Sequence, residues 1–428
     1  MRAAIEVEGH PGETGLDRYV AAPDGGARWD AAGPPEAALG GGVTQTLRLR
    51  SQVWRGLEWT HRLYAGVPGE VTPDAPLWLY VTGDGDHGFE WTMLQALAGR
   101  TRCPVAMLCG VPNQPLLEGL GEDALIAATF ERFLDGAGPE AADWPLLLPM
   151  TKAAVRAMDA LQEWTAARGV AARRFIVSGA SKRGWTAYLT AAVDRRVAGL
   201  APMVYDNLNL QAQLRRQYEV FGSDLSPEIG DYVAHRITAA IGDGGQRAWE
   251  LAEMVDPYTY RDRLTQAKCL LLGTNDPYWP VDALRLYRED LPGETAVAYF
   301  PNCGHGLGDP ARLLGALLRL HAAVTAASPL PRVRLDGTIS GGRVRLHAAA
   351  DVDGPLRLWR AQADGQDFRD AKWAAEPLAD GAPWSGEISA LDGRWQALYV
   401  EADVAVPAMA GRIGLDSPVL LLPPAGAL

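Results

Sequence analysis

Apolar runs that alternate with helix-like segments constrain the fold of this chain more than any other feature. Five runs read as strands that are apolar on both faces, and they span residues 77–81, 105–108, 199–204, 268–273 and 295–300. Such strands occur in parallel sheets covered by helices on both sides, because a strand with one wet face alternates apolar and polar residues. Helical patterns lie between or after these runs, at 89–98, 149–167, 281–288 and 311–326. The sequence therefore predicts an α/β protein with a doubly wound, mostly parallel sheet.

Two other segments depart from this alternation. Residues 46–54 alternate in polarity and residues 57–64 do so less cleanly, which predicts antiparallel strands at one edge of the sheet. Residues 205–264 show a helical pattern without a clear strand. We expect that insertion to form a helical cap over the functional site, because such folds carry a cap at this position.

The alternation of strands and helices stops at Pro329-Leu330-Pro331. Proline fixes its own backbone dihedral and restricts the residue before it, so this segment predicts a stiff connector. Short alternating runs follow without a helical pattern, which indicates a small β-sandwich similar to an immunoglobulin domain. We therefore predict two domains, residues 1–328 with the cap insertion and residues 332–428. The second could bind carbohydrate, mediate homodimer formation or cover an exposed sheet edge.

The segment from Arg174 to Trp185 reads as a strand, a tight turn, a serine and a helix. Its β-branched and aromatic run ends at Gly179, and Ser181 follows two residues later. This is the sequence form of a nucleophile elbow, in which a strained turn lifts a serine hydroxyl above the sheet. Arg183 stands where the G-x-S-x-G pattern has its second glycine, so a plain strand-to-helix turn or a phosphate-binding loop fits this segment about equally well.

Partners for the serine follow two later strands. A serine hydroxyl needs a base, and the base needs a carboxylate that orients it. Asp276 comes directly after one predicted strand and His305 after the next, so the order is that of the α/β-hydrolases. A structural turn histidine is the alternative for His305. Asp206 is the second candidate for the acid, because it also follows a strand; it could instead cap the first helix of the cap.

The negative charge that develops in acyl transfer needs hydrogen-bond donors. The backbone N–H of Lys182 is one candidate, and the loop after Val81, around Gly83 and Asp84, is the other. The Lys182 ammonium either adds to this site or is a solvated side chain. Asp84 and Asp86 are unusual beside an anion, but a turn that hydrogen-bonds its own backbone explains them better than a metal site does. We predict no metal and no cofactor.

Composition excludes several classes of partner. The net charge of −12 disfavours nucleic acid and anionic membrane surfaces. Residues 1–19 contain no apolar run, and no later stretch is long and apolar enough to span a bilayer, so we expect a cytoplasmic protein. The four cysteines are scattered without a CxxC pair, which predicts buried free thiols.

Several motifs resemble the PhoPQ-activated pathogenicity-related protein family. They lie at 111–115, 122–127, 148–159, 179–185, 189–197, 205–209 and 256–258, and the resemblance spans about 45–320. It implies an α/β-hydrolase fold and supports Ser181, Asp276 and His305 as the catalytic residues. The biochemical activity of the family is poorly defined. Its members resemble secreted or periplasmic proteins. This chain departs from them, because residues 1–19 do not read as a signal peptide.

The elbow is also similar to that of the glucuronoyl esterases, which carry G-x-S-R-x-G. This similarity implies that Lys182 helps to bind the oxyanion and that a sugar ester is a candidate substrate. Aromatic residues of the cap and Trp279 could then stack on sugar rings, although burial in the core is their commoner role. The candidate oxyanion- and substrate-binding residues are Gly83, Asp84, Lys182, Arg183, Tyr205, Asp206 and Trp279.

The sequence thus favours a serine hydrolase that cleaves an ester. Its substrate would be a small molecule or a peptide. The alternative is a serine peptidase of the aminopeptidase or dipeptidyl-peptidase type, in which Glu118, Glu122 or Asp206 would bind the free amine. A third interpretation is a binding or signalling protein whose triad is idle.

Overall fold

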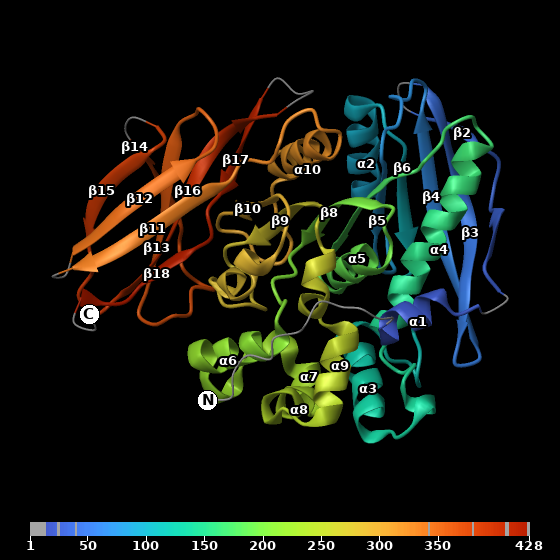
Figure 1. Ribbon diagram of the computed structural model, residues 1–428, viewed down its shortest axis with the longest axis horizontal. Helices are drawn as coiled ribbons and strands as arrows, with labels where there is room; N and C mark the ends of the chain where they lie inside the picture. Colours follow the sequence, from blue (N-terminus) through green and yellow to red (C-terminus); the bar gives the residue numbers. More distant parts are fainter. Residues whose placement is uncertain are drawn as a thin grey trace.

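The computed structural model describes residues 14–23, 26–38, 41–340, 343–378, 381–406 and 411–425. One long twisted sheet runs through the molecule, with helices on both of its faces and the C-terminal strands at one end (Figure 1). The fold class predicted from the apolar runs is confirmed.

The central part of the sheet has the strand order β3-β4-β6-β5-β7-β8-β9-β10. The bounds of these strands are β3 Gly42–Trp54, β4 Leu57–Pro68, β5 Leu77–Val81, β6 Val105–Cys109, β7 Phe175–Ala180, β8 Val197–Met203, β9 Ala267–Gly273 and β10 Thr295–Phe300. Neighbours from β6 to β10 pair in parallel, whereas β4 pairs antiparallel with both β3 and β6. The short strands β1 (Arg28–Ala31) and β2 (Glu36–Ala37) both pair with β3. Because the parallel strands share one direction, the turns after β7, β8, β9 and β10 meet at one edge.

Helices pack on both faces and enclose two buried apolar clusters. One cluster contains residues of α1 (Gly15–Ala21), α3 (Glu122–Asp135), α4 (Leu147–Ala166) and α5 (Lys182–Val193). The other contains residues of α2 (Gly88–Thr101) and α10 (Pro310–Val324). The sheet lies between these clusters, as expected for a doubly wound fold.

Two helical segments differ from the sequence-based expectation. The structure contains α3, followed by the short turn η1 (Pro139–Ala141), where we predicted no helix. The helix predicted at 281–288 is wrong, because this segment forms two 3₁₀ turns, η5 (Ala283–Leu286) and η6 (Arg288–Asp290). Tyr287 adopts φ −152° between them, with its ring buried and its hydroxyl bonded to Asp206. Tertiary packing of Tyr287 therefore interrupts the helical run.

The segment between β8 and β9 is helical throughout and contains no strand. It comprises α6 Leu210–Phe221, η2 Gly222–Asp224, η3 Pro227–Ile229, α7 Gly230–Ala234, α8 Ile237–Asp243, α9 Gln246–Val255 and η4 Pro257–Arg263. The four α-helices lie together with α3 at one end of the molecule (Figure 1). His235, the residue after α7, lies 2.7 Å from Glu131 on α3, and this contact ties the helical cap to the main body.

The C-terminal strands form two antiparallel sheets. Strands β11 (Val333–Ser340), β12 (Arg343–Ala350) and β15 (Trp384–Ser389) make one sheet. The other contains β13 Leu356–Ala363, β14 Ala374–Leu378, β16 Trp395–Ala405, β17 Arg412–Asp416 and β18 Leu420–Leu422. Apolar side chains of both sheets belong to one buried cluster, so the two sheets face each other.

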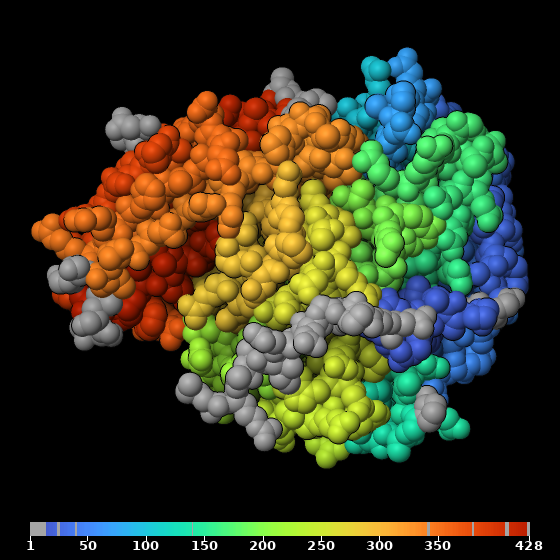
Figure 2. Space-filling view, in the orientation of Figure 1, coloured from blue at the N-terminus to red at the C-terminus, as the bar shows by residue number. Residues whose placement is uncertain are grey.

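One of these two sheets continues the central sheet. Strand β17 pairs antiparallel with β10 at Val297 and Asp416. The edge of the parallel sheet is therefore covered, which is one of the three roles the sequence left open for this region. Residues beyond 330 lie directly against the central part of the molecule on the face shown in Figure 2. The boundary at residues 328–332 stays a prediction.

Candidate active site

Ser181 occupies a strained turn between β7 and α5. Its backbone has φ 55° and ψ −127°, a conformation that costs a non-glycine residue about 1–3 kcal/mol. The Ser181 N–H donates to the carbonyl of Met203 at 2.8 Å, which holds the turn against β8. The Ser181 side chain makes no capping hydrogen bond to the helix it precedes. Its hydroxyl therefore stays available, as in a nucleophile elbow.

The turn is possible because glycine stands at position 179. A Cβ atom on Gly179 would lie 2.6 Å from the carbonyl oxygen of Arg183 and 2.9 Å from its Cβ. Gly184 is also close-packed, since a Cβ there would lie 3.1 Å from the Gly179 carbonyl oxygen. Positions 179 and 183 are in contact, and the glycine at 179 alone leaves the space that this contact needs. Position 183 can therefore carry an arginine where the usual pattern has its second glycine.

Arg183 fastens the loop before α3 to the elbow. Its Nε donates to the Val111 carbonyl at 2.6 Å, and its two terminal nitrogens bind Glu122 at 2.6 and 2.7 Å. A Cβ on Gly83 would overlap this guanidinium, so Gly83 makes room for it. Burial acts to raise the pKa of Glu122, but the hydrogen bonds and charges of Arg183 and Lys182 hold it well below its usual value.

Lys182 is buried between two carboxylates. Its ammonium lies 2.9 Å from Glu122 and 3.0 Å from Asp123, and its side chain is only 8% exposed. Asp123 also accepts a hydrogen bond of 3.0 Å from the hydroxyl of Tyr232 in the cap. Sequence reasoning missed Asp123 as a site residue, although it lies in a motif shared with the family. The structure therefore places Lys182 in a paired network and not in solvent.

Asp276 and His305 form the second half of the site. They follow β9 and β10, and Nδ1 of His305 lies 2.8 Å from Oδ2 of Asp276. The other carboxylate oxygen of Asp276 accepts the backbone N–H of Tyr278 at 3.0 Å. The Tyr278 ring lies over the imidazole, with centroids 4.4 Å apart. Nε2 of His305 is buried and forms no hydrogen bond with any residue that the structure describes, Ser181 included.

Asp206 lies near the Asp276–His305 pair, but its hydrogen-bond partner differs from that of Asp276. It is 5% exposed and accepts a hydrogen bond of 2.7 Å from the hydroxyl of Tyr287. Burial raises the pKa of Asp206 to about 7. Its side chain forms no hydrogen bond to His305, whereas that of Asp276 does. Both carboxyl groups line a void of about 10 Å³ together with Trp279.

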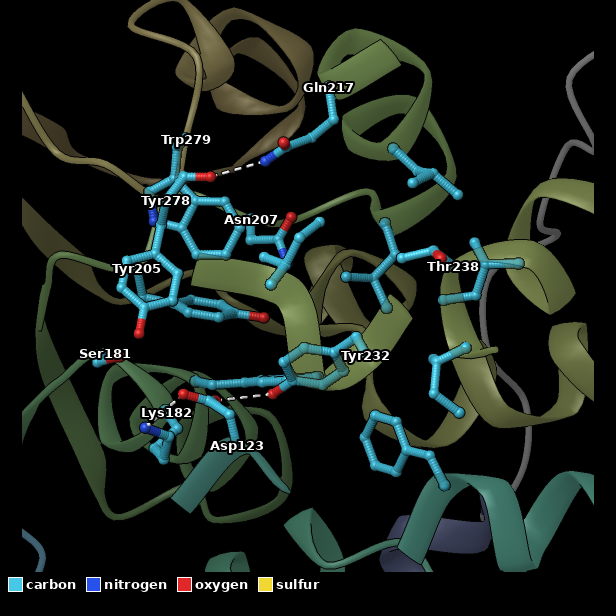
Figure 3. Close-up of a pocket in the computed structure, with 17 residues that line it drawn as sticks. Asp123, Ser181, Lys182, Tyr205, Asn207, Gln217, Tyr232, Thr238, Tyr278 and Trp279 are labelled. Atoms are coloured by element: carbon cyan, nitrogen blue, oxygen red, sulfur yellow. Dashed lines mark hydrogen bonds and ion pairs between the residues drawn. The ribbon is translucent and has the colours of Figure 1, made fainter. Parts of the chain in front are cut away.

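A cavity of about 90 Å³ extends from Ser181 beneath the cap (Figure 3). Its apolar walls come from Phe130, Trp185, Leu210, Leu214, Ile229, Ile237, Ile241 and Trp279. Its polar lining comes from Asp123, Ser181, Lys182, Tyr205, Asn207, Gln217, Tyr232, Thr238 and Tyr278. The cavity is therefore an apolar chamber with its polar groups at a few fixed positions.

The predicted binding residues divide into two groups. Lys182, Tyr205 and Trp279 line the cavity with Ser181. The lining of that cavity does not include Gly83, Asp84, Arg183 or Asp206. Asp84 is exposed in the loop after β5. That loop remains a candidate for the second oxyanion donor only through its backbone.

The backbone N–H of Lys182, the first oxyanion donor expected from the sequence, lies at the start of α5. Lys182 is the first residue of this 12-residue helix, so its backbone N–H has no acceptor within the helix. The helix dipole adds partial positive charge at this end, directly beside Ser181. The arrangement favours an anion next to the serine.

The described residues contain no cluster of three or more His, Cys, Asp or Glu side chains placed to hold a metal ion. None of their helices has the length and apolar character needed to cross a membrane.

The strand order, the elbow and the Asp276–His305 pair together define an α/β-hydrolase fold. The chain belongs to the family described as PhoPQ-activated pathogenicity-related protein, whose model matches residues 16–369. The match extends beyond the motifs at 45–320 and reaches into the C-terminal strands.

The chain is similar to several known proteins. It is 27% identical to autocrine proliferation repressor protein A of Dictyostelium discoideum over 434 residues, which covers 91% of this chain and 86% of that protein. An acetyl xylan esterase from Paenibacillus sp. R4 is 15% identical, with a TM-score of 0.48 over 72% of this chain and 90% of that one. A glucuronoyl esterase from Solibacter usitatus is 15% identical, with a TM-score of 0.42 over 65% and 77% of the two chains.

Proposed function

We propose that this protein is a serine hydrolase that cleaves esters, and that an apolar part of the ester occupies the cavity. Ser181 is the nucleophile, His305 the base and Asp276 the acid that orients the base. The observation that carries the proposal is the strained, uncapped Ser181 at the wall of an apolar cavity. The Asp276–His305 pair supports it, because the imidazole is held through Nδ1 and keeps Nε2 for proton transfer.

The reaction has two halves. Ser181 Oγ attacks the ester carbonyl carbon, its proton passes to His305 Nε2, and the carbonyl π electrons move to the oxygen. The start of α5 stabilises that oxyanion. When the tetrahedral intermediate collapses, the alcohol leaves with the proton from His305, and the acyl group stays on Ser181. Water then repeats these steps, releases the acid and restores the serine.

The charges around the cavity favour an ester over a peptide with a free amino terminus. A peptidase of that kind needs carboxylates that are free to bind an ammonium group. Glu122 and Asp123 are the acids next to the elbow, and Arg183, Lys182 and Tyr232 already bind them. Lys182 is likewise compensated, which argues against a negatively charged sugar acid as the buried group. An apolar neutral group fits these walls best.

Labelling with a fluorophosphonate tests the proposal, because this probe reacts with an activated serine. The wild type should become labelled and Ser181→Ala should not. Ser178→Ala is the matched control, since Ser178 lies on β7 just before the elbow but donates its hydroxyl to the Ala201 carbonyl at 2.7 Å in the core. We expect the control to label normally. Undiminished labelling of Ser181→Ala would place the nucleophile elsewhere.

A substrate panel tests the preference for esters. 4-Nitrophenyl esters with two- to eight-carbon acyl chains should be hydrolysed, and aminoacyl amides should not. Hydrolysis of the amides with little action on the esters would favour the peptidase alternative.

A further inference from the structure

The hydroxyl of Tyr205 is a buried polar group on the wall of the apolar cavity. Tyr205 is only 3% exposed and lines the same cavity as Ser181. Its hydroxyl oxygen forms no hydrogen bond with any residue that the structure describes. Figure 3 shows Tyr205 among the side chains that surround this space. Leaving a buried hydroxyl without a partner costs about 1–3 kcal/mol, and native proteins rarely do so.

The Tyr205 ring is held firmly in this position. It stacks on Trp185, with centroids 5.3 Å apart and planes at 19°, and Trp279 meets it edge-on at 6.2 Å. The preceding residue, Val204, has φ 45°, which is an outlier for a β-branched side chain. Its backbone N–H is bonded to the Leu271 carbonyl at 2.8 Å, which retains the strained turn. Backbone strain of this kind concentrates at functional positions.

We propose that Tyr205 determines specificity by donating a hydrogen bond to an oxygen atom on the part of the substrate inside the cavity. The preferred substrates are then esters whose buried group is an apolar skeleton with a hydroxyl, ether or carbonyl oxygen. This inference rests on the proposed esterase function and names the substrate class of the same site.

Two features of the cavity agree with an oxygenated apolar group. Burial raises the pKa of Tyr205 well above its usual value, so the side chain stays a neutral O–H donor. Asn207 and Thr238 line the same cavity with polar side chains. They offer further partners for a polar substituent in a chamber that is otherwise apolar.

Reversible boronic acids test the inference without requiring the natural substrate. Ser181 Oγ adds to boron, and the serine proton passes to His305, so a tetrahedral boronate forms in the site. The probes are 2-phenylethylboronic acid and its three ring-hydroxylated isomers. The isomers place one oxygen at successive depths in the cavity. Inhibition constants are measured on hydrolysis of a 4-nitrophenyl ester.

We expect at least one hydroxylated isomer to bind the wild type about tenfold more tightly than the parent, which corresponds to about 1.4 kcal/mol and is within the range of a single hydrogen bond. In Tyr205→Phe the inhibition constants of the parent and that isomer should agree within about twofold, because only the hydroxylated compound should bind more weakly. Tyr188→Phe is the matched control. Tyr188 is fully buried and packs beside Tyr205, with centroids 6.3 Å apart, but it does not line the cavity. It should keep the wild-type preference.

The outcomes separate the two proposals. If boronic acids bind the wild type but none of the isomers exceeds the parent, Tyr205 has no such role, and the esterase proposal stands. A preference that survives in Tyr205→Phe also overturns the inference. If no boronic acid binds and fluorophosphonate fails to label the wild type, the esterase proposal itself is wrong. The wild-type comparison needs no variant, so it holds even if Tyr205→Phe folds poorly.

Discussion

At the scale of single residues, two buried aspartates at the same sheet edge have different surroundings. Asp276 bonds to His305 Nδ1 and to the Tyr278 N–H, so hydrogen-bond donors face both of its oxygens. Burial raises the pKa of Asp206 to about 7, the charges of Asp276 and Asp282 act in the same direction, and Tyr287 is its hydroxyl donor. A carboxylate that orients an imidazole must bond to it, and of the two aspartates Asp276 is the one that bonds to His305.

Asp276→Asn should therefore lower turnover by about three to four orders of magnitude, because an amide there favours the wrong imidazole tautomer. Asp206→Asn should change turnover by less than about tenfold. The measurement is kcat on a 4-nitrophenyl ester at pH 7. A crippled Asp206→Asn beside a mild Asp276→Asn would reverse the two assignments.

Asp206→Asn also has an expected effect on stability that depends on pH. The folded state holds the Asp206 proton up to about pH 7, whereas the unfolded chain releases it near pH 4. This contribution to wild-type stability is complete below pH 4 and is lost as the pH rises to 7. Asparagine cannot ionise, so the stability of the variant relative to the wild type should rise by roughly 3–4 kcal/mol between pH 4 and pH 8. Urea unfolding at both pH values measures this difference, and a constant difference would contradict the assignment.

At the scale of elements, the loop between β13 and β14 supports both turns that carry the acid and the histidine. Nδ2 of Asn275 donates to the carbonyls of Arg369 at 2.9 Å and Ala371 at 2.7 Å. Asn302 and Trp373 exchange two hydrogen bonds, of 3.0 and 2.8 Å. Asn275 precedes Asp276 directly, so this loop holds the turn that carries the acid.

Asn275→Ala should lower kcat by about ten- to a hundredfold, because small displacements of catalytic groups have effects of that size. KM should change little, since the cavity walls are untouched. Asn113→Ala is the matched control: Asn113 accepts the Thr60 N–H at 3.0 Å and also ties a loop to backbone. The control should keep wild-type kinetics. A rise in KM at constant kcat for Asn275→Ala would show that the loop acts on binding instead.

At the scale of the whole molecule, a buried charge network joins α10 to the C-terminal strands. Arg312 on α10 binds Glu401 of β16 at 2.7 Å and Asp416 of β17 at 3.0 Å. The side chains of Glu401 and Asp416 are 3% and 0% exposed. Asp416 also accepts the Tyr299 N–H of β10 at 2.6 Å, beside the point where β10 and β17 pair. The two parts of the chain are therefore connected through backbone and charge.

Arg312→Met should destabilise the protein by about 3–5 kcal/mol, because it leaves buried carboxylates without their partner. Arg343→Met is the matched control. Arg343 pairs with Glu387 at 3.3 Å and is 76% exposed, so its loss should cost less than about 1 kcal/mol. Denaturant unfolding measures both. If both variants lost the same free energy of unfolding, the network would contribute nothing to the contact between α10 and the C-terminal strands.

The sequence by itself determined the parallel strands, the elbow serine and the order of the candidate triad. Each of these depends on neighbours in the chain: an apolar run forms a buried strand, and the residues after it lie at one sheet edge. It did not separate Asp276 from Asp206, because both follow strands that end at that edge. It also missed α3 and predicted a helix at 281–288, where the packing of Tyr287 interrupts the run.

Only the tertiary structure decided what the charged and polar residues around the serine do. Arg183 and Lys182 lie beside Ser181 in sequence, yet their partners Glu122 and Asp123 come from α3, about 60 residues earlier. The hydroxyl of Tyr205 has no hydrogen-bond partner among the described residues, because aromatic and aliphatic side chains form the walls around it. The continuation of the sheet from β10 into β17 likewise joins residues 119 positions apart. Local patterns do not carry this information, because long-range pairing depends on which surfaces meet once the chain has folded.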